Sequence, residues 1–247
     1  MTPRQGQLIM IAGRSGAQKS GFALYWLQQM GLPTLYFSGD MTPFEATSRL
    51  ACMELGWETE DVERWWTDPI EGPKVHEALT KSPIKFSFGN PITFDNIWAE
   101  IQAWVEIYNE YPPIIAIDNL MDVEGCADED NAAQRQAMSY FYQLLMNTGS
   151  TIVVIHHATD KSERGDQLPG IPPSKREVKN GVGEKPQFMW TVALDPESLE
   201  FRVACVKQRM GKSDPSAKNF VRLQADPKST RFGPLNKHTP HWGKDAM

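Results

Sequence analysis

Short apolar runs alternate with segments of helical periodicity through residue 157 of the chain. A buried strand is predicted for residues 7–12, which lead into a glycine, and a helix for residues 19–30, where apolar side chains recur every three or four positions. The same pattern predicts further strands at 34–38, 84–88, 113–118 and 150–156, and further helices at 43–55, 94–108 and 131–146. Strands that alternate with helices favour a mostly parallel sheet with helices on both faces.

Two stretches interrupt this alternation. Residues 57–91 hold several tryptophans and prolines and are less regular, apart from the strand near their end. Residues 158–187 are polar, with glycines, prolines and several cations. They predict a loop far longer than the usual connection, and therefore a functional or disordered one.

An antiparallel extension is predicted for the last part of the sheet. Residues 188–194 and 199–206 flank a short polar turn, which indicates a hairpin, and residues 220–223 are a candidate further strand. From residue 228 onward the chain shows no core pattern. The predicted fold class is therefore α/β, a twisted and mostly parallel sheet with a C-terminal antiparallel hairpin.

Composition narrows the class of protein. The 247 residues suit one large α/β domain, and 40% hydrophobic with 23% charged residues excludes wholesale disorder. The chain has no run of 18 apolar residues, and its first apolar stretch is too short for a secretory signal. Three widely spaced cysteines without a C-x-x-C pair exclude a disulfide scaffold or a structural zinc site. These features favour a soluble cytoplasmic protein.

Charge is distributed unevenly along the chain. The formal net charge is −6, yet residues 202–247 hold ten Lys and Arg against three Asp and Glu. The negative net charge of the whole chain argues against a protein that binds nucleic acid with its entire surface. It does not exclude a local strip of basic residues. We expect residues 1–233 to form one domain and residues 234–247 a flexible basic tail.

The strongest local motif lies between the first predicted strand and helix. Backbone N–H groups of such a loop can wrap a polyphosphate, and the helix N-terminus adds a favourable dipole. Lys19 can neutralise phosphate charge and the Ser20 hydroxyl can ligate Mg²⁺, whereas Gln18 stands where the usual pattern has glycine. The alternative is a glycine-rich turn capped by a lysine. The predicted nucleotide-binding residues are Gly13, Arg14, Ser15, Gly16, Ala17, Gln18, Lys19 and Ser20.

Two carboxylates follow predicted strands. Asp118 ends an apolar strand, at the sheet edge where ligands bind, and can hold the water shell of Mg²⁺; otherwise it caps the next turn. Asp40 follows the second strand and can activate a water for attack on a γ-phosphate. Its alternative role is to cap the helix that begins near Pro43, where Thr42 competes; Glu45 is a weaker candidate base.

Histidines and cations supply the last two motifs. His156 and His157 are adjacent on a strand, so they point to opposite faces and cannot chelate one metal together. One of them can instead sense the γ-phosphate, or simply form a hydrogen bond at the strand end. Lys207 and Arg209 alternate on an emerging strand and can reach a phosphate in a neighbouring subunit, or form a solvated basic edge.

The order of these motifs resembles the RecA-like ATPase domain of the replicative hexameric (DnaB-like) helicase family. IAGRSGAQKS matches the family's phosphate loop, and SGDM matches its S-L-E-M segment, with Asp40 in the place of the catalytic glutamate. The resemblance implies a Mg²⁺-site aspartate at Asp118, a γ-phosphate sensor at His157, and a K-x-R-x-G finger at Lys207 and Arg209. It covers roughly residues 5–233, and we expect the family's N-terminal domain to be absent.

The resemblance also implies cofactors and partners. We expect ATP and Mg²⁺ as cofactors, a homo-oligomeric ring or filament, single-stranded DNA as partner and no membrane. Two rival functions stay open: a recombination or strand-annealing ATPase of the same fold, and a nucleotide-binding scaffold with little hydrolysis. The long polar loop is the candidate DNA contact, with cations Lys161, Arg164, Lys175, Arg176, Lys179 and Lys185.

Overall fold

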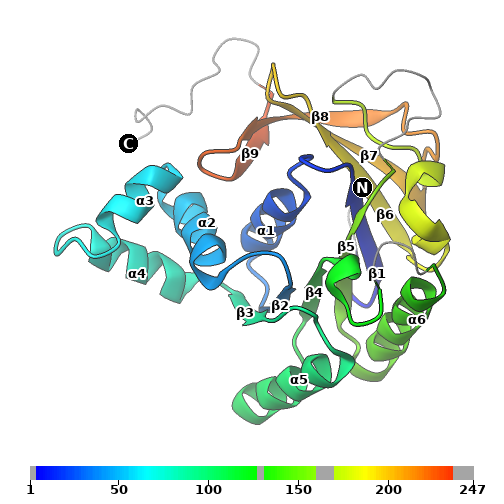
Figure 1. Ribbon diagram of the computed structural model, residues 1–247, viewed down its shortest axis with the longest axis horizontal. Coiled ribbons are helices and arrows are strands. Elements are labelled where there is room, and N and C mark those ends of the chain that lie inside the picture. The colour runs from blue at the N-terminus through cyan, green and yellow to red at the C-terminus, as the bar shows by residue number, and fades with distance from the viewer. Residues whose placement is uncertain (1–3, 127–130, 160–169, 236–247) are drawn as a thin grey trace.

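The computed structural model of the chain describes residues 4–126, 131–159 and 170–235 (Figure 1). Its strands and helices confirm the predicted alternation, with most boundaries within one or two residues of the expected ones. In chain order the elements are β1 (Leu8–Gly13), α1 (Lys19–Met30), β2 (Thr34–Ser38), α2 (Pro43–Leu55), α3 (Thr59–Trp65), α4 (Gly72–Lys81), β3 (Ile84–Phe88), α5 (Phe94–Tyr108), β4 (Ile114–Asp118), η1 (Leu120–Asp122), α6 (Asn131–Thr148), β5 (Thr151–His157), η2 (Lys175–Glu177), η3 (Lys179–Glu184), β6 (Phe188–Leu194), β7 (Glu200–Gln208), β8 (Phe220–Asp226) and β9 (Arg231–Pro234).

All of these strands join one sheet in the order β3-β2-β4-β5-β1-β6-β7-β8-β9. The pairs from β3 through β6 are parallel, and the pairs from β6 through β9 are antiparallel. The predicted fold class is therefore confirmed. Because the strands β2, β4, β5 and β1 are adjacent and parallel, their carboxyl ends meet along one edge of the sheet.

Helices cover both faces of the sheet. The core on one face packs α5 and α6 against the sheet, and the core on the other face packs α1 and α2 against it. The two faces are filled by alternate residues of β1, since Leu8 and Met10 belong to one core and Ile9 and Ile11 to the other. Burial on both sides explains why these strands are continuous apolar runs rather than alternating ones.

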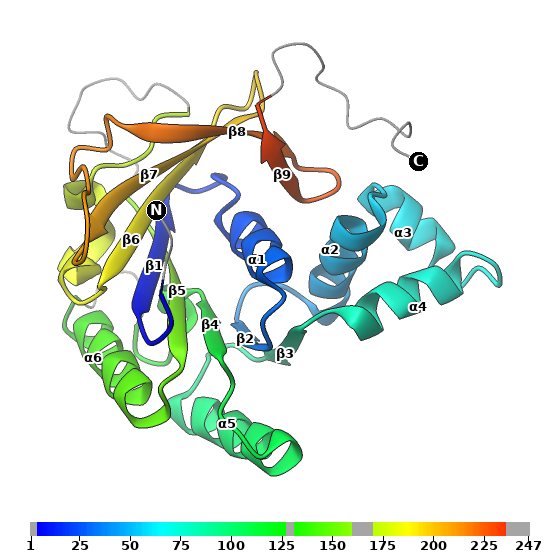
Figure 2. The same ribbon diagram turned by 180° about the vertical axis from the view of Figure 1, so that it is seen from behind.

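The region expected to be less regular contains two helices. α3 and α4 pack beside α2 at one end of the molecule, beyond β3 (Figure 2). Val62 and Val75 form a small apolar cluster with Ala51 and Cys52 of α2. The tryptophans and prolines obscured this amphipathic pattern, and Pro73 breaks nothing because it lies in the first turn of α4, where its missing N–H is not needed.

The absence of a core pattern after residue 228 is a second expectation that is wrong. Residues Arg231–Pro234 form β9, which pairs with β8 and lies over α1 (Figure 1). Phe232 is buried there against Phe22 and Phe201, with ring centroids 5.5 and 4.7 Å apart. One buried aromatic side chain in a short strand is too little periodicity to detect in the sequence. Of the predicted tail, residues 236–247 lie outside the described residues.

No helix within the described parts of the chain is both long enough and apolar enough to cross a membrane.

Candidate nucleotide-binding site

The predicted phosphate loop connects β1 to α1 at the carboxyl edge of the sheet (Figure 1). Gly13 lies so close to β6 that a Cβ atom added to it would be 2.8 Å from the carbonyl oxygen of Val192. Gly16 has a φ of +72°, which favours glycine, and Ser15 and Gly16 are exposed at the tip of the loop. The two glycines therefore allow the tight strand-to-helix turn that a phosphate-wrapping loop requires.

Lys19 and Ser20 begin α1 and point into the carboxyl edge. The Lys19 side chain is buried, and its Nζ donates a hydrogen bond to the Arg14 carbonyl oxygen at 2.9 Å. The Ser20 hydroxyl donates to Asp118 Oδ1 at 3.0 Å, across two elements that are 98 residues apart in sequence. The structure thus places the lysine and the hydroxyl of the phosphate loop and the strand-end carboxylate of a second motif in one site.

Asp118 has a further partner that the sequence analysis missed. The Tyr36 hydroxyl of β2 donates to Asp118 Oδ2 at 2.6 Å, and both side chains are buried. Burial raises the pKa of Asp118, against the effect of the hydrogen bonds from Tyr36 and Ser20, and burial likewise raises the pKa of Tyr36. A tyrosine inside an otherwise apolar strand was the available signal, because a buried tyrosine hydroxyl usually finds a polar partner.

Asp40 is exposed in the turn after β2 and does not cap α2. Thr42 is the N-cap residue, and its hydroxyl accepts a hydrogen bond from the Glu45 N–H. The Glu45 carboxylate returns the interaction by accepting from the Thr42 N–H and hydroxyl at 2.8 Å each. These hydrogen bonds lower the pKa of Glu45. Glu45 and Thr42 therefore form the capping box of α2, and Asp40 has no capping role.

Asp122 is a second residue that the sequence analysis did not single out. Asp122 lies in η1 and packs against Gly39, since a Cβ atom added to Gly39 would be 2.4 Å from Asp122 Cβ. One oxygen of the Asp122 carboxylate accepts a hydrogen bond from the Asn119 N–H. Burial raises the pKa of Asp122, and the negative charge of Asp40 raises it further. Asp40, Asp118 and Asp122 therefore bring an excess of negative charge to this edge.

The two histidines point to opposite faces of β5, as alternation requires. His156 is fully buried, its Nε2 is 3.3 Å from the Lys179 carbonyl oxygen, and burial lowers its pKa to about 4, so it is neutral at pH 7. His157 is half-buried and lies opposite Gly13 in the register of β5 with β1. His157, the predicted sensor, is therefore beside the start of the phosphate loop.

Lys207 and Arg209 have different environments. Lys207, in β7, donates from Nζ to the carbonyl oxygens of Gly183, at 3.0 Å, and Glu184. Burial lowers the pKa of Lys207 to about 8, and neighbouring cations act in the same direction. Arg209 is exposed in the turn just beyond β7, where its backbone N–H donates to the Gln187 carbonyl oxygen. They do not alternate along one strand, because the strand ends between them.

The end of the long polar loop is ordered and half-buried. Residues 170–184, which we call the basic segment, include η2 and η3. Its part from Ser174 to Glu184 contributes to the lining of a pocket of about 1140 Å³. Lys175, Arg176 and Lys179 of this segment line the pocket together with Pro215 and Ser216. Two further predicted DNA contacts lie outside the described residues: Lys161 and Arg164.

Arg14 turns away from the tip of the phosphate loop. Its Nη2 forms an ion pair with Glu177 Oε1 at 2.8 Å, and its Nη1 donates to the Ile171 carbonyl oxygen at 2.9 Å. The sequence did not predict a role for Glu177. It is a single acidic residue among cations, and it lies 163 residues from Arg14, so no sequence pattern links the two. The pair ties the phosphate loop to the basic segment.

Gln18 occupies the strained position that glycine holds in the usual loop. Its φ is +56°, a left-handed conformation, between buried Ala17 and Lys19. We expect Gln18→Gly to raise the free energy of unfolding by about 0.5–1 kcal/mol. Glycine removes the roughly 1–2 kcal/mol of steric strain that a left-handed conformation costs a residue with a Cβ atom, and this gain exceeds the entropic cost of glycine. Thermal and urea unfolding measure the change.

The matched control is Gln29→Gly, an exposed glutamine near the end of α1 with ordinary helical geometry. It is expected to lower the free energy of unfolding by about 1 kcal/mol. Equal destabilisation by both glycine variants would show that the left-handed conformation of Gln18 costs nothing.

Comparisons with known proteins identify a family and a fold for the chain. The model of the family described as AAA domain matches residues 3–163. The Gene 65 protein of Mycobacterium phage L5 is 31% identical over 229 residues, which cover 90% of this chain and 83% of that protein. A solved ATPase domain is similar with a TM-score of 0.77 at 16% identity, over 94% of this chain and 86% of that chain. The structure of a DnaB-like replicative helicase and its interactions with primase has a TM-score of 0.78 at 15% identity, over 94% of this chain and 58% of that chain. At such identities the solved structures establish the shared RecA-like fold.

Proposed function

The chain belongs to the AAA domain family, and from this premise we propose that it is a Mg²⁺-dependent ATPase that couples hydrolysis to action on single-stranded DNA, as a DnaB-like helicase does. The observation that carries the proposal is the Ser20–Asp118 contact at the mouth of the phosphate loop. We assign the ATPase domain to residues 1–233 and its place of action to the cytoplasm.

Phosphate binding is assigned to the loop backbone and Lys19. Residues 13–20 direct the N-terminus of α1 toward the site, and phosphate oxygens can replace the Arg14 carbonyl as the acceptor for Lys19 Nζ. The buried position of Lys19 strengthens its attraction for phosphate, because water screens the charges less there.

The donor set fits magnesium. Mg²⁺ prefers oxygen ligands, keeps several waters and shares phosphate oxygens, so it needs few protein ligands. The Ser20 hydroxyl and the Asp118 carboxylate supply such oxygens side by side. When bound, the ion neutralises charge on the transferred phosphoryl group.

Hydrolysis is assigned to three further positions. Asp40, exposed and released from helix capping, accepts the proton of the attacking water. His157, beside Gly13, donates to the γ-phosphate. Arg209 of one subunit reaches the nucleotide of its neighbour in a homo-oligomer, while Lys207 contacts η3 of its own subunit.

Contact with single-stranded DNA is assigned to the basic segment. We expect the combined replacement of Lys175, Arg176 and Lys179 by alanine to reduce the slope of log affinity against log salt by about 2, because each phosphate contact to a single strand contributes roughly 0.7. Fluorescence anisotropy of a labelled oligonucleotide, titrated at several salt concentrations, measures the slope.

A matched triple variant replaces Lys74, Lys81 and Lys85, three exposed lysines of α4 and β3, with alanine. This control removes the same number of cations far from the pocket. An equal loss of salt slope in both triples would mean that the protein attracts DNA only through its overall charge, and the assigned contact would be rejected.

The function is tested by phosphate release with and without single-stranded DNA, together with the mass of the assembly. Stimulated release and a nucleotide-dependent oligomer are expected. Release without polar strand displacement in a fork assay would favour the recombination or annealing ATPase. Bound nucleotide without release above background would favour the scaffold.

A further inference from the structure

One side chain of the phosphate loop is committed to a distant segment. The Arg14 guanidinium bridges two points of the basic segment, the Glu177 carboxylate at 2.8 Å and the Ile171 carbonyl oxygen at 2.9 Å. Only 18% of the Arg14 side chain and 2% of the Glu177 side chain are exposed. Breaking such a buried pair leaves an uncompensated charge and is therefore costly in free energy. Movement of one of the two groups is thus expected to move the other.

Glu177 is also the organising residue of the turn that it belongs to. Its Oε2 accepts from the Ser174 N–H at 2.6 Å, and its carbonyl oxygen accepts from the Thr159 N–H at 2.7 Å. Lys175 and Arg176 precede it and line the pocket assigned to DNA. The position of the Glu177 carboxylate therefore determines where these cations stand.

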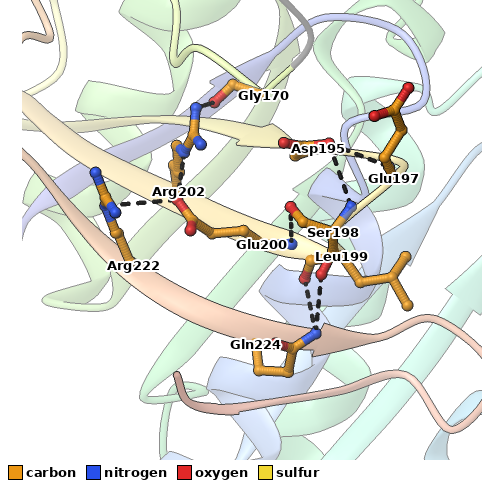
Figure 3. Close-up of polar contacts among 9 residues, drawn as sticks. All are labelled: Gly170, Asp195, Glu197, Ser198, Leu199, Glu200, Arg202, Arg222 and Gln224. Carbon is orange, nitrogen blue, oxygen red and sulfur yellow. Dashed lines mark hydrogen bonds and ion pairs between the residues drawn. The ribbon is translucent and has the colours of Figure 1, made fainter. Parts of the chain in front are cut away.

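Other contacts hold the basic segment without touching the phosphate loop, and two of them come from β7. Arg202 of β7 donates from Nη1 to the Gly170 carbonyl oxygen at 3.0 Å and is itself fixed by Glu200 (Figure 3). Lys207 holds the other end through Gly183 and the carbonyl that follows it. The segment is thus fixed at both ends to the antiparallel strands, and in its middle to the nucleotide site.

The hydrogen bond from Lys19 Nζ to the Arg14 carbonyl completes the connection. When Lys19 turns to a phosphate group it gives up this bond, and the backbone of Arg14 loses a restraint. The negative phosphates also compete with Glu177 for the nearby guanidinium charge. Both effects act on Arg14, whose guanidinium is paired with Glu177.

We propose that Arg14 and Glu177 are positioning residues that link nucleotide occupancy of the phosphate loop to the placement of the basic segment. The inference rests on the proposed function, since it takes the loop as a nucleotide site. It adds the route by which ATP binding changes the DNA-contacting cations: Lys19, Arg14, Glu177, then Lys175 and Arg176.

Amide hydrogen exchange of the full chain tests the route, with the non-hydrolysable analogue AMP-PNP and Mg²⁺ as the probe. In the wild-type protein we expect the analogue to slow exchange in peptides from residues 13–20 and to change exchange in peptides from residues 171–179 by at least about threefold. Glu177→Gln is expected to keep the first response and lose the second. Glu177→Asp, which retains the charge, is expected to recover part of it.

The matched control is Glu184→Gln, an exposed acid at the end of the same segment, which is expected to leave both responses unchanged. A response confined to residues 13–20 in the wild-type protein would overturn the linkage and leave the proposed nucleotide site standing. No response in either peptide would overturn the nucleotide site and the linkage with it. Because these outcomes are read in the wild-type protein, they hold even where a variant fails to fold.

Discussion

Replacing Lys19 with alanine is expected to lower ATP hydrolysis by about 100- to 1,000-fold, to the level of the background. The ammonium group lies at the start of α1, buried beside the Ser20–Asp118 pair, where its charge is poorly screened. On the proposed function, its removal takes away the donor assigned to the phosphate oxygens on which charge develops during the reaction. Phosphate release, measured at saturating ATP with and without single-stranded DNA, gives the loss.

Lys85→Ala is the matched control, because Lys85 is an exposed lysine on the edge strand β3. It is expected to hydrolyse ATP at the wild-type rate. Thermal unfolding of both variants separates a lost charge from a lost fold. Hydrolysis by a folded Lys19→Ala protein within threefold of the control would rule out the phosphate-binding role of Lys19.

The alternation of strands and helices was predictable because it rests on local patterns. Helix α1 begins and ends where its apolar spacing and Gly31 indicate, and Gly31 takes the left-handed conformation that closes the helix. α3, α4 and β9 were missed because each is short and contributes only one to three buried residues. Their stability comes from packing against α2 and α1, which periodicity within the segment does not reveal.

The residues of the site divide in the same way. Lys19, Ser20 and Asp118 were predictable, since each stands at the end of a strand or the start of a helix and parallel strands bring those ends together. Tyr36 and Glu177 were not, because each acts through one contact with a residue far away in the sequence. Such pairs follow from the sheet order and the path of the loops.

The direction of a side chain was equally out of reach. Arg14 belongs to the phosphate loop by sequence, yet it contacts the basic segment, and Lys207 belongs to the finger motif, yet it contacts η3 of its own subunit. Both cations donate to carbonyl oxygens in partly buried surroundings, where backbone oxygens are usually paired. Of the finger motif, the exposed Arg209 is the residue best placed to meet another subunit.

Arg209→Ala is accordingly expected to leave nucleotide affinity within about twofold of the wild-type value and to lower turnover by about 10³- to 10⁵-fold, the contribution of an arginine finger supplied in trans. Arg209 follows the end of β7. The hydrogen bond from its backbone N–H to the Gln187 carbonyl oxygen fixes the backbone, and its side chain is exposed. Arg222→Ala is the control, an exposed arginine on β8 whose Nε lies 3.5 Å from Glu200 Oε1 (Figure 3). Normal hydrolysis by Arg209→Ala would refute the finger role.

Mixing the two inactive variants distinguishes a finger supplied by a neighbour from one that acts within its own chain. A subunit with Arg209→Ala keeps Lys19, and a subunit with Lys19→Ala keeps Arg209, so a complete site forms wherever the first receives its finger from the second. In a head-to-tail assembly of equal parts, random mixing restores about a quarter of the sites. If Arg209 acted on the nucleotide of its own chain, each variant would lack one essential group in every site, and the mixture would be as inactive as its components.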